Sequence, residues 1–164
     1  AEYTRTNIIN YKHSIDVLTW ASNSYNLGHY LGDNAQEIYL SAGYKPLRGL
    51  DISLNYLNAK HGNEYDYVRR QNNVAVINDI ISQPSLGDVI WKNQTIGLKL
   101  VYELFNNGYA VINLENSNIE GFDATSGPIA GERRMTATEA LNYYTPALFR
   151  GKNTTLTVGF SFGF

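Results

Sequence analysis

The last eleven residues constrain the fold more than any other feature of this chain. From Thr154 to Phe164, large apolar side chains alternate strictly with small or polar ones. Because successive residues of a β-strand point to opposite faces, this segment predicts a strand with one apolar and one polar face. The apolar positions are Leu156, Val158, Phe160, Phe162 and Phe164.

This ending has two interpretations. A strand of a soluble β-sandwich can alternate in the same way. The segment also resembles the C-terminal recognition signal of outer-membrane β-barrels, whose last residue is usually Phe, with Val158, Phe160, Phe162 and Phe164 as its apolar positions. That resemblance implies that the barrel-assembly machinery is a partner, that the chain ends at its true C-terminus, and that it lies in the outer membrane of a Gram-negative bacterium.

Five earlier segments repeat the alternation, which is clearest from Leu50 to Tyr56. Together with the last segment they predict an all-β, antiparallel, transmembrane up-and-down β-barrel. The predicted strands cover about residues 2–11, 37–45, 50–60, 93–105, 109–120 and 154–164.

The connections between these strands alternate in length. Pro46-Leu47-Arg48-Gly49 and Asn106-Asn107-Gly108 predict tight turns, because their residues favour turn conformations. Residues 12–36, 62–92 and 124–152 form long connections. If the last strand ends at the periplasm, both tight turns are periplasmic and all three long loops are external, as in membrane barrels.

Composition agrees with a barrel. No run of about 18 apolar residues is present, so no helix is expected to span a membrane. Mean hydropathy is −0.31, as barrel strands allow, because only alternate residues contact lipid. The net charge of −2 argues against nucleic acid as a partner, since phosphate binding needs clustered Lys and Arg.

Six strands are too few to close a barrel, whose smallest natural form has about eight. We therefore expect residues 1–164 to be the C-terminal portion of one larger barrel domain. The missing strands would lie upstream or in a partner chain.

Several motifs resemble the capsule-assembly Wzi-like outer-membrane barrel family. They are Glu2-Tyr3-Thr4-Arg5, the segment from Leu27 to Leu40, the turn from Pro46 to Leu50, and the segment from Tyr144 to Thr154. The resemblance implies a large barrel that helps hold or assemble surface polysaccharide and is not an enzyme. A porin or a plugged-receptor transport barrel would carry the same strands, turns and ending.

The loop from Gly28 to Asn34 is the candidate glycan site. His29, Asp33 and Asn34 could hydrogen-bond a sugar while Tyr30 stacks on its apolar face. The alternative is a structural turn in which the glycines supply special backbone angles. Basic loop residues also suggest lipopolysaccharide as a partner beside membrane lipid.

Catalytic, metal and cofactor sites are not expected. The chain has three histidines at no ligand-like spacing and no cysteine. His13 and Ser14 are adjacent, and neighbours on a strand point to opposite faces, which disfavours a catalytic pair. Among the loops, Thr136 and Glu139 form a capping-box pattern that predicts a short helix before Pro146.

Overall fold

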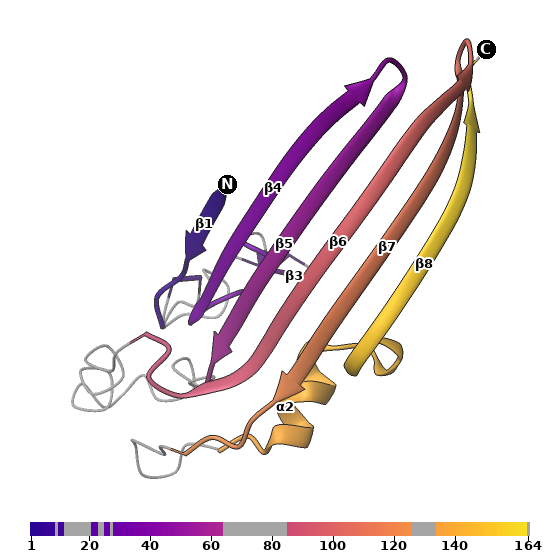
Figure 1. Cartoon of the computed structure of the whole chain (residues 1–164). Helices are drawn as coiled ribbons and strands as arrows, with labels where there is room; N and C mark the ends of the chain where they lie inside the picture. The colour runs from indigo at the N-terminus through magenta and orange to yellow at the C-terminus, as the bar shows by residue number, and fades with distance from the viewer. Residues whose placement is uncertain are drawn as a thin grey trace.

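The computed structural model describes residues 1–8, 10–11, 21–22, 25–26, 28–63, 85–125 and 134–163. Its main feature is one antiparallel sheet of six strands in the order β1-β4-β5-β6-β7-β8 (Figure 1). The strands are β1 (Glu2–Arg5), β4 (Ala35–Leu47), β5 (Leu50–Gly62), β6 (Val89–Phe105), β7 (Gly108–Gly121) and β8 (Gly151–Phe162). The smaller elements are the paired strands β2 (Ala21–Ser22) and β3 (Tyr25–Asn26), helix α2 (Ala137–Tyr144) and the 3₁₀ turn η3 (Ala147–Phe149).

The prediction of an all-β, antiparallel, six-strand arrangement is confirmed. Strands β4 to β7 each pair with the next strand along the chain, so β4 to β8 form an up-and-down meander. The sheet is open, with β1 and β8 at its two edges, and it is not a closed barrel.

The strand bounds differ from the predicted ones mainly at the ends. The first strand stops at Arg5 rather than near Tyr11. At Thr6 the side-chain hydroxyl replaces the backbone as the acceptor for the Ala35 N–H, at 3.0 Å, and the hydroxyl itself donates to the Gly32 carbonyl at 2.7 Å. At the other end of the chain, β8 begins at Gly151, three residues before the predicted start.

The tight turns are shorter than the sequence predicts. Strand β4 continues through Pro46, where the register shifts between Tyr44 and Leu47, so Arg48 and Gly49 alone connect it to β5. A bulge tolerates proline because it leaves one residue outside the ladder. In the second turn Asn107 has φ 62°, a conformation that asparagine adopts more readily than most residues.

Both two-residue turns lie at one end of the sheet, together with the end of β8, while the long connections lie at the other end (Figure 1). Those two ends are called the turn end and the loop end below. The alternation of short and long connections is therefore a property of the fold.

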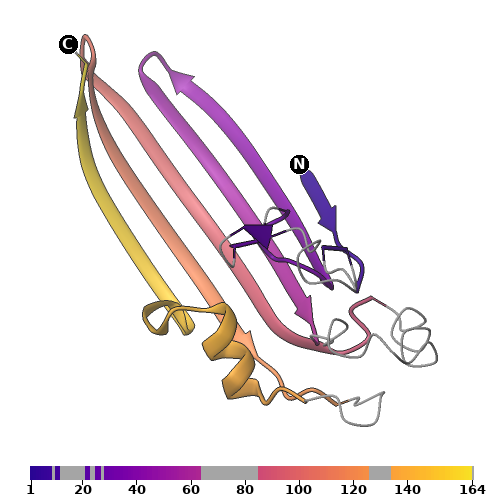
Figure 2. The same ribbon diagram turned by 180° about the vertical axis from the view of Figure 1, so that it is seen from behind.

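The apolar core of the described residues lies at the loop end, beside the sheet rather than between two sheets. Ala59, Ile90 and Ala140 are fully buried there, and Trp91 is nearly so. Helix α2 covers this cluster, packing against β6 and β7 on one face of the sheet (Figure 2).

The predicted capping box begins α2 as expected. The Thr136 hydroxyl accepts from the Glu139 backbone N–H, and the Glu139 carboxylate accepts from the Thr136 backbone N–H. Two donors that the first turn of a helix leaves unpaired are thereby satisfied. The segment Val74 to Ser82, which the sequence left open as helix or strand, lies outside the described residues.

Candidate functional site

One face of the sheet is apolar across five strands. Residues that pair directly across neighbouring strands point to the same face, so the register gives rows of side chains. Three successive rows contain only apolar or tyrosine residues. They are Ala42-Leu54-Leu98-Leu114-Leu156, Tyr44-Ile52-Leu100-Ile112-Val158 and Leu47-Leu50-Tyr102-Ala110-Phe160.

This apolar face is open to the surroundings. Leu54, Leu156 and Phe160 expose 53%, 64% and 66% of their surface, whereas a core residue of a water-soluble domain exposes almost none. Contiguous apolar patches on soluble monomers seldom exceed a few hundred Å². An exposed apolar face that runs across five strands is therefore unlike the usual surface of a soluble monomer.

Aromatic residues mark the turn end of the apolar face. The rings of Phe105 and Phe162 stack with their centroids 5.9 Å apart. Phe105 lies over Gly108, where a Cβ would come within 2.4 Å of the ring, so glycine makes room for this pair. Tyr109 pairs with Glu103 and Ser161 and thus lies on the opposite face.

The opposite face is polar. Its central rows are Ser41-Asn55-Gly97-Glu115-Thr155 and Gly43-Ser53-Lys99-Asn113-Thr157. Nearer the turn end, the Lys45 ammonium lies 2.9 Å from a carboxylate oxygen of Asp51. Helix α2 packs on this same face. Gly121 lies against the first residue of the helix, and Trp91 bonds Thr145 at its end. Both belong to the row Ala35-His61-Trp91-Gly121, which is an even number of residues from the polar rows along each strand.

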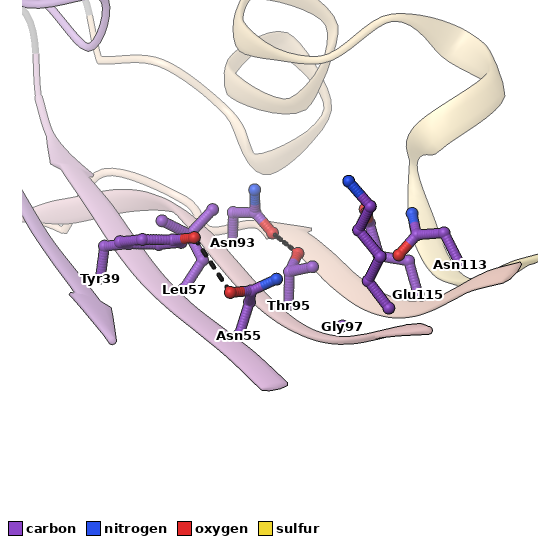
Figure 3. Close-up of a pocket in the computed structure, with 9 residues that line it drawn as sticks. Tyr39, Asn55, Leu57, Asn93, Thr95, Gly97, Asn113 and Glu115 are labelled. Atoms are coloured by element: carbon purple, nitrogen blue, oxygen red, sulfur yellow. Dashed lines mark hydrogen bonds between the residues drawn. The ribbon is translucent and has the colours of Figure 1, made fainter. Parts of the chain in front are cut away.

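A hollow of about 370 Å³ lies on the polar face, over the middle of the sheet. Figure 3 shows its side chains rising from the sheet on the side of the helix. Gly97 forms its floor, since a residue without a side chain leaves space between the neighbouring strands. The lining residues are Tyr39, Asn55, Leu57, Asn93, Thr95, Gly97, Lys99, Asn113 and Glu115.

Two hydrogen bonds orient groups in the hollow. The Tyr39 hydroxyl donates to Asn55 Oδ1 at 3.1 Å, and the Thr95 hydroxyl donates to Asn93 Oδ1 at 2.9 Å (Figure 3). Each asparagine thus has its oxygen engaged, which leaves its NH₂ group as the remaining hydrogen-bonding group.

The charged groups of the hollow stand apart. Within the described part of the chain, neither Lys99 nor Glu115 lies within 4.0 Å of a group of opposite charge. They occupy adjacent rows on β6 and β7, so one positive and one negative group face the same space.

The predicted glycan residues divide into two kinds. Asp33 and Asn34 are buried, with 6% and 3% of their surface exposed. The Asp33 carboxylate accepts from the backbone N–H groups of Asn10 and Tyr11 at 2.7 and 2.9 Å. Its role in the described structure is to fasten one loop segment to another.

Asn34 joins three segments at the loop end. Its Oδ1 accepts from the Leu86 backbone N–H at 2.8 Å, and its Nδ2 donates to the Asn63 carbonyl at 2.9 Å. Its φ is 52°, which the asparagine side chain tolerates. Gly62 makes room, because a Cβ there would lie 2.2 Å from Asn34 Nδ2.

His29 and Tyr30 are more accessible to a ligand. Tyr30 exposes 67% of its surface, and its ring centroid lies 4.7 Å from that of His29. The Tyr30 hydroxyl donates to the Glu37 carboxylate, and His29 Nε2 lies 4.0 Å from the same group. Partial burial and this contact with Glu37 raise the pKa of Tyr30, so the hydroxyl stays protonated.

Of the predicted assembly-signal residues, Val158, Phe160 and Phe162 lie on the apolar face of the edge strand β8, and Phe164 lies outside the described residues. His13 and Ser14 also lie outside them. Sequence reasoning missed Glu37 and Trp91, whose contacts join distant segments and leave no local pattern.

Among the described residues there is no group of three His, Cys, Asp or Glu side chains that could hold a metal ion. None of the helices in that part of the chain is long and apolar enough to cross a membrane. Comparison with known proteins returned no match among family models, curated proteins or solved structures.

Proposed function

We propose that this chain forms part of the wall of an outer-membrane β-barrel in a Gram-negative bacterium, with the apolar face toward lipid and the polar face toward the lumen. The proposal rests on one observation, the three successive apolar rows that continue across five strands. Lipid hydrocarbon is the partner that matches three successive rows without a charged or amide side chain.

The dimensions agree with this assignment. On β6 the apolar face runs from Ile96 to Leu104, which is about 27 Å along a strand at about 3.4 Å per residue. At a barrel tilt of about 40° this covers about 20 Å of membrane thickness, close to the ~25 Å apolar band of such barrels. The long strands also exceed the usual five or six residues of strands in soluble proteins.

For the barrel we further propose binding or anchoring of surface polysaccharide by the external loops, as the resemblance to the Wzi-like family implies. Tyr30 supports this role because it is exposed at the loop end and adjoins His29. Lipopolysaccharide, the barrel-assembly machinery and further strands that complete the wall are the partners of this proposal.

A second candidate is solute transport. The hollow favours it, together with Lys99 and Glu115, which have no partner of opposite charge within 4.0 Å among the described residues, because a lumen wall that contacts solute carries such groups. The two functions differ in outcome: transport predicts steady ion conductance of the full protein in planar bilayers, and glycan anchoring does not require it.

The test combines location with retention of polysaccharide. Cells expressing the full protein are fractionated, and we expect it in the outer membrane, extracted only with detergent. Shortening the three long connections should release surface polysaccharide, while Arg48→Lys in a turn at the opposite end serves as the control. Extraction without detergent contradicts the barrel, and unchanged retention contradicts the glycan role alone.

A further inference from the structure

We propose that the hollow over Gly97 is a binding site for a neutral, hydroxyl-rich solute, a sugar of one or two rings. The inference rests on the proposed function, because only in a barrel does this face become the wall of an enclosed lumen. It concerns the middle of the polar face and is independent of the loop residues His29 and Tyr30.

The charge of the hollow selects against ions. Lys99 and Glu115 contribute one positive and one negative group, so the site has no net charge. An anion would face the Glu115 carboxylate, and a cation would face the Lys99 ammonium. A neutral ligand that can both donate and accept hydrogen bonds meets neither penalty.

The remaining polar groups match sugar hydroxyls. The NH₂ groups of Asn55 and Asn93 are oriented by the bonds that engage their oxygens, so they present donors. The Glu115 carboxylate offers two acceptor oxygens. Tyr39 stands at the β4 side of the hollow, where an aromatic ring can lie against the apolar face of a sugar (Figure 3).

The size fits as well. A volume of about 370 Å³ lies in the lower part of the range for small-molecule sites, about 300–1,000 Å³. Gly97 creates this space, because it has no side chain of its own between those of Asn55 and Glu115, the two residues that pair with it directly. A Cβ at Gly97 would lie 3.9 Å from Asn55 Cβ and 4.0 Å from the Leu114 carbonyl oxygen, so the backbone accepts a larger residue there without a clash.

These contacts allow a matched pair of variants. Gly97→Val fills the hollow with a residue that strands favour. Gly159→Val places the same side chain on the same face, in the row of Val111, where a Cβ meets nothing within 4 Å. We expect both variants to keep the fold, because neither added Cβ would lie closer than 3.9 Å to another atom, and only the first changes the hollow.

The experiment is saturation-transfer NMR on the full protein in detergent micelles. The neutral probes are glucose, maltose and N-acetylglucosamine, and glucose 6-phosphate and spermidine are the charged controls. We expect saturable binding of at least one neutral sugar and none of the charged probes. Gly97→Val should weaken that binding about tenfold or more, because it removes the space and its hydrogen bonds, while Gly159→Val stays within about twofold.

Two outcomes overturn the inference. One is the absence of binding by all three neutral sugars in a protein that requires detergent and inserts into membranes, which leaves the proposed function intact. The other is equal binding by the Gly97→Val variant. A protein that is extracted without detergent contradicts the proposed function and this inference together, so the two failures are distinguishable.

Discussion

Trp91 and Thr145 join the sheet to the end of α2 by a buried hydrogen bond. The indole Nε1–H donates to the Thr145 hydroxyl oxygen over 2.8 Å, and both residues expose 5% or less of their surface. Since they are 54 positions apart, this contact fixes the long connection between β7 and β8 on the polar face. Tyr144 adds a ring contact with His61, at 4.2 Å between centroids.

Thr145→Val should loosen α2 without unfolding the sheet. The substitution keeps the shape of the side chain but leaves the Trp91 N–H buried without its acceptor, at a cost of about 1–3 kcal/mol. Hydrogen–deuterium exchange should therefore speed up in residues 137–145 and stay unchanged in β5 to β7. Thr145→Ser retains the hydroxyl and should exchange like the native protein; equal acceleration in both variants would contradict the assigned role of the hydrogen bond.

Gly121→Ala should displace α2 by a steric route. A Cβ at this position would lie 2.1 Å from the Ala137 carbonyl oxygen, a backbone atom that cannot move unless the helix moves. We expect faster exchange in α2 and a change in Trp91 fluorescence. Gly43→Ala is the matched control on the same face, since its nearest contact is the Ile52 carbonyl oxygen at 3.9 Å. Similar effects of both substitutions would count against the close approach of α2 to β7.

Asn34→Ala should destabilise the loop end. It leaves the Leu86 N–H and the Asn63 carbonyl without partners, which costs about 1–3 kcal/mol, and alanine does not favour a φ of 52°. Unfolding in urea in the presence of lipid vesicles measures the loss. Leu148→Ala, at a side chain that is 79% exposed, should change stability by about 0.5 kcal/mol or less. If Asn34→Ala leaves stability unchanged, its contacts do not organise the loop.

Leu98→Arg should destabilise the folded protein in a bilayer by roughly 2–4 kcal/mol, while Lys99→Arg should be nearly silent. The two positions are adjacent on β6, but Leu98 belongs to an apolar row and Lys99 to a polar one. Urea unfolding in vesicles gives both values under the same conditions. Equal values would show that the two faces are wrongly assigned to lipid and lumen.

The sequence predicted the sheet well because an alternating pattern within one strand reflects the different surroundings of the two faces of the sheet. The segment from Leu50 to Tyr56 alternates without exception and forms the first part of β5, and the capping pattern at Thr136 likewise indicates the start of α2. Pro46 was misread as part of a turn, since a bulge that accommodates proline depends on the pairing with β5. A pattern within one segment indicates the local backbone geometry, but it does not indicate how that segment pairs with another strand.

The loop end could not be predicted because its contacts are long-range. The glycine-flanked sequence around Asp33 and Asn34 does not indicate that both side chains are buried. The partner of Asn34 at Leu86 lies 52 positions away, and no spacing in the sequence indicates it. The hollow over Gly97 likewise depends on the register of three strands, which the sequence of one strand does not contain.

The most direct test of the membrane-wall assignment is a cysteine scan of β6. Residues 1–164 contain no cysteine, so once any cysteine outside this segment is replaced, single cysteines at positions 96 to 101 can each carry a fluorophore on the full protein in vesicles. Brominated lipid should quench the label at 96, 98 and 100 strongly and at 97, 99 and 101 weakly, because alternate residues contact lipid. Uniform quenching along the scan, or none at any position, would contradict a lipid-facing apolar side and a polar side turned away from lipid.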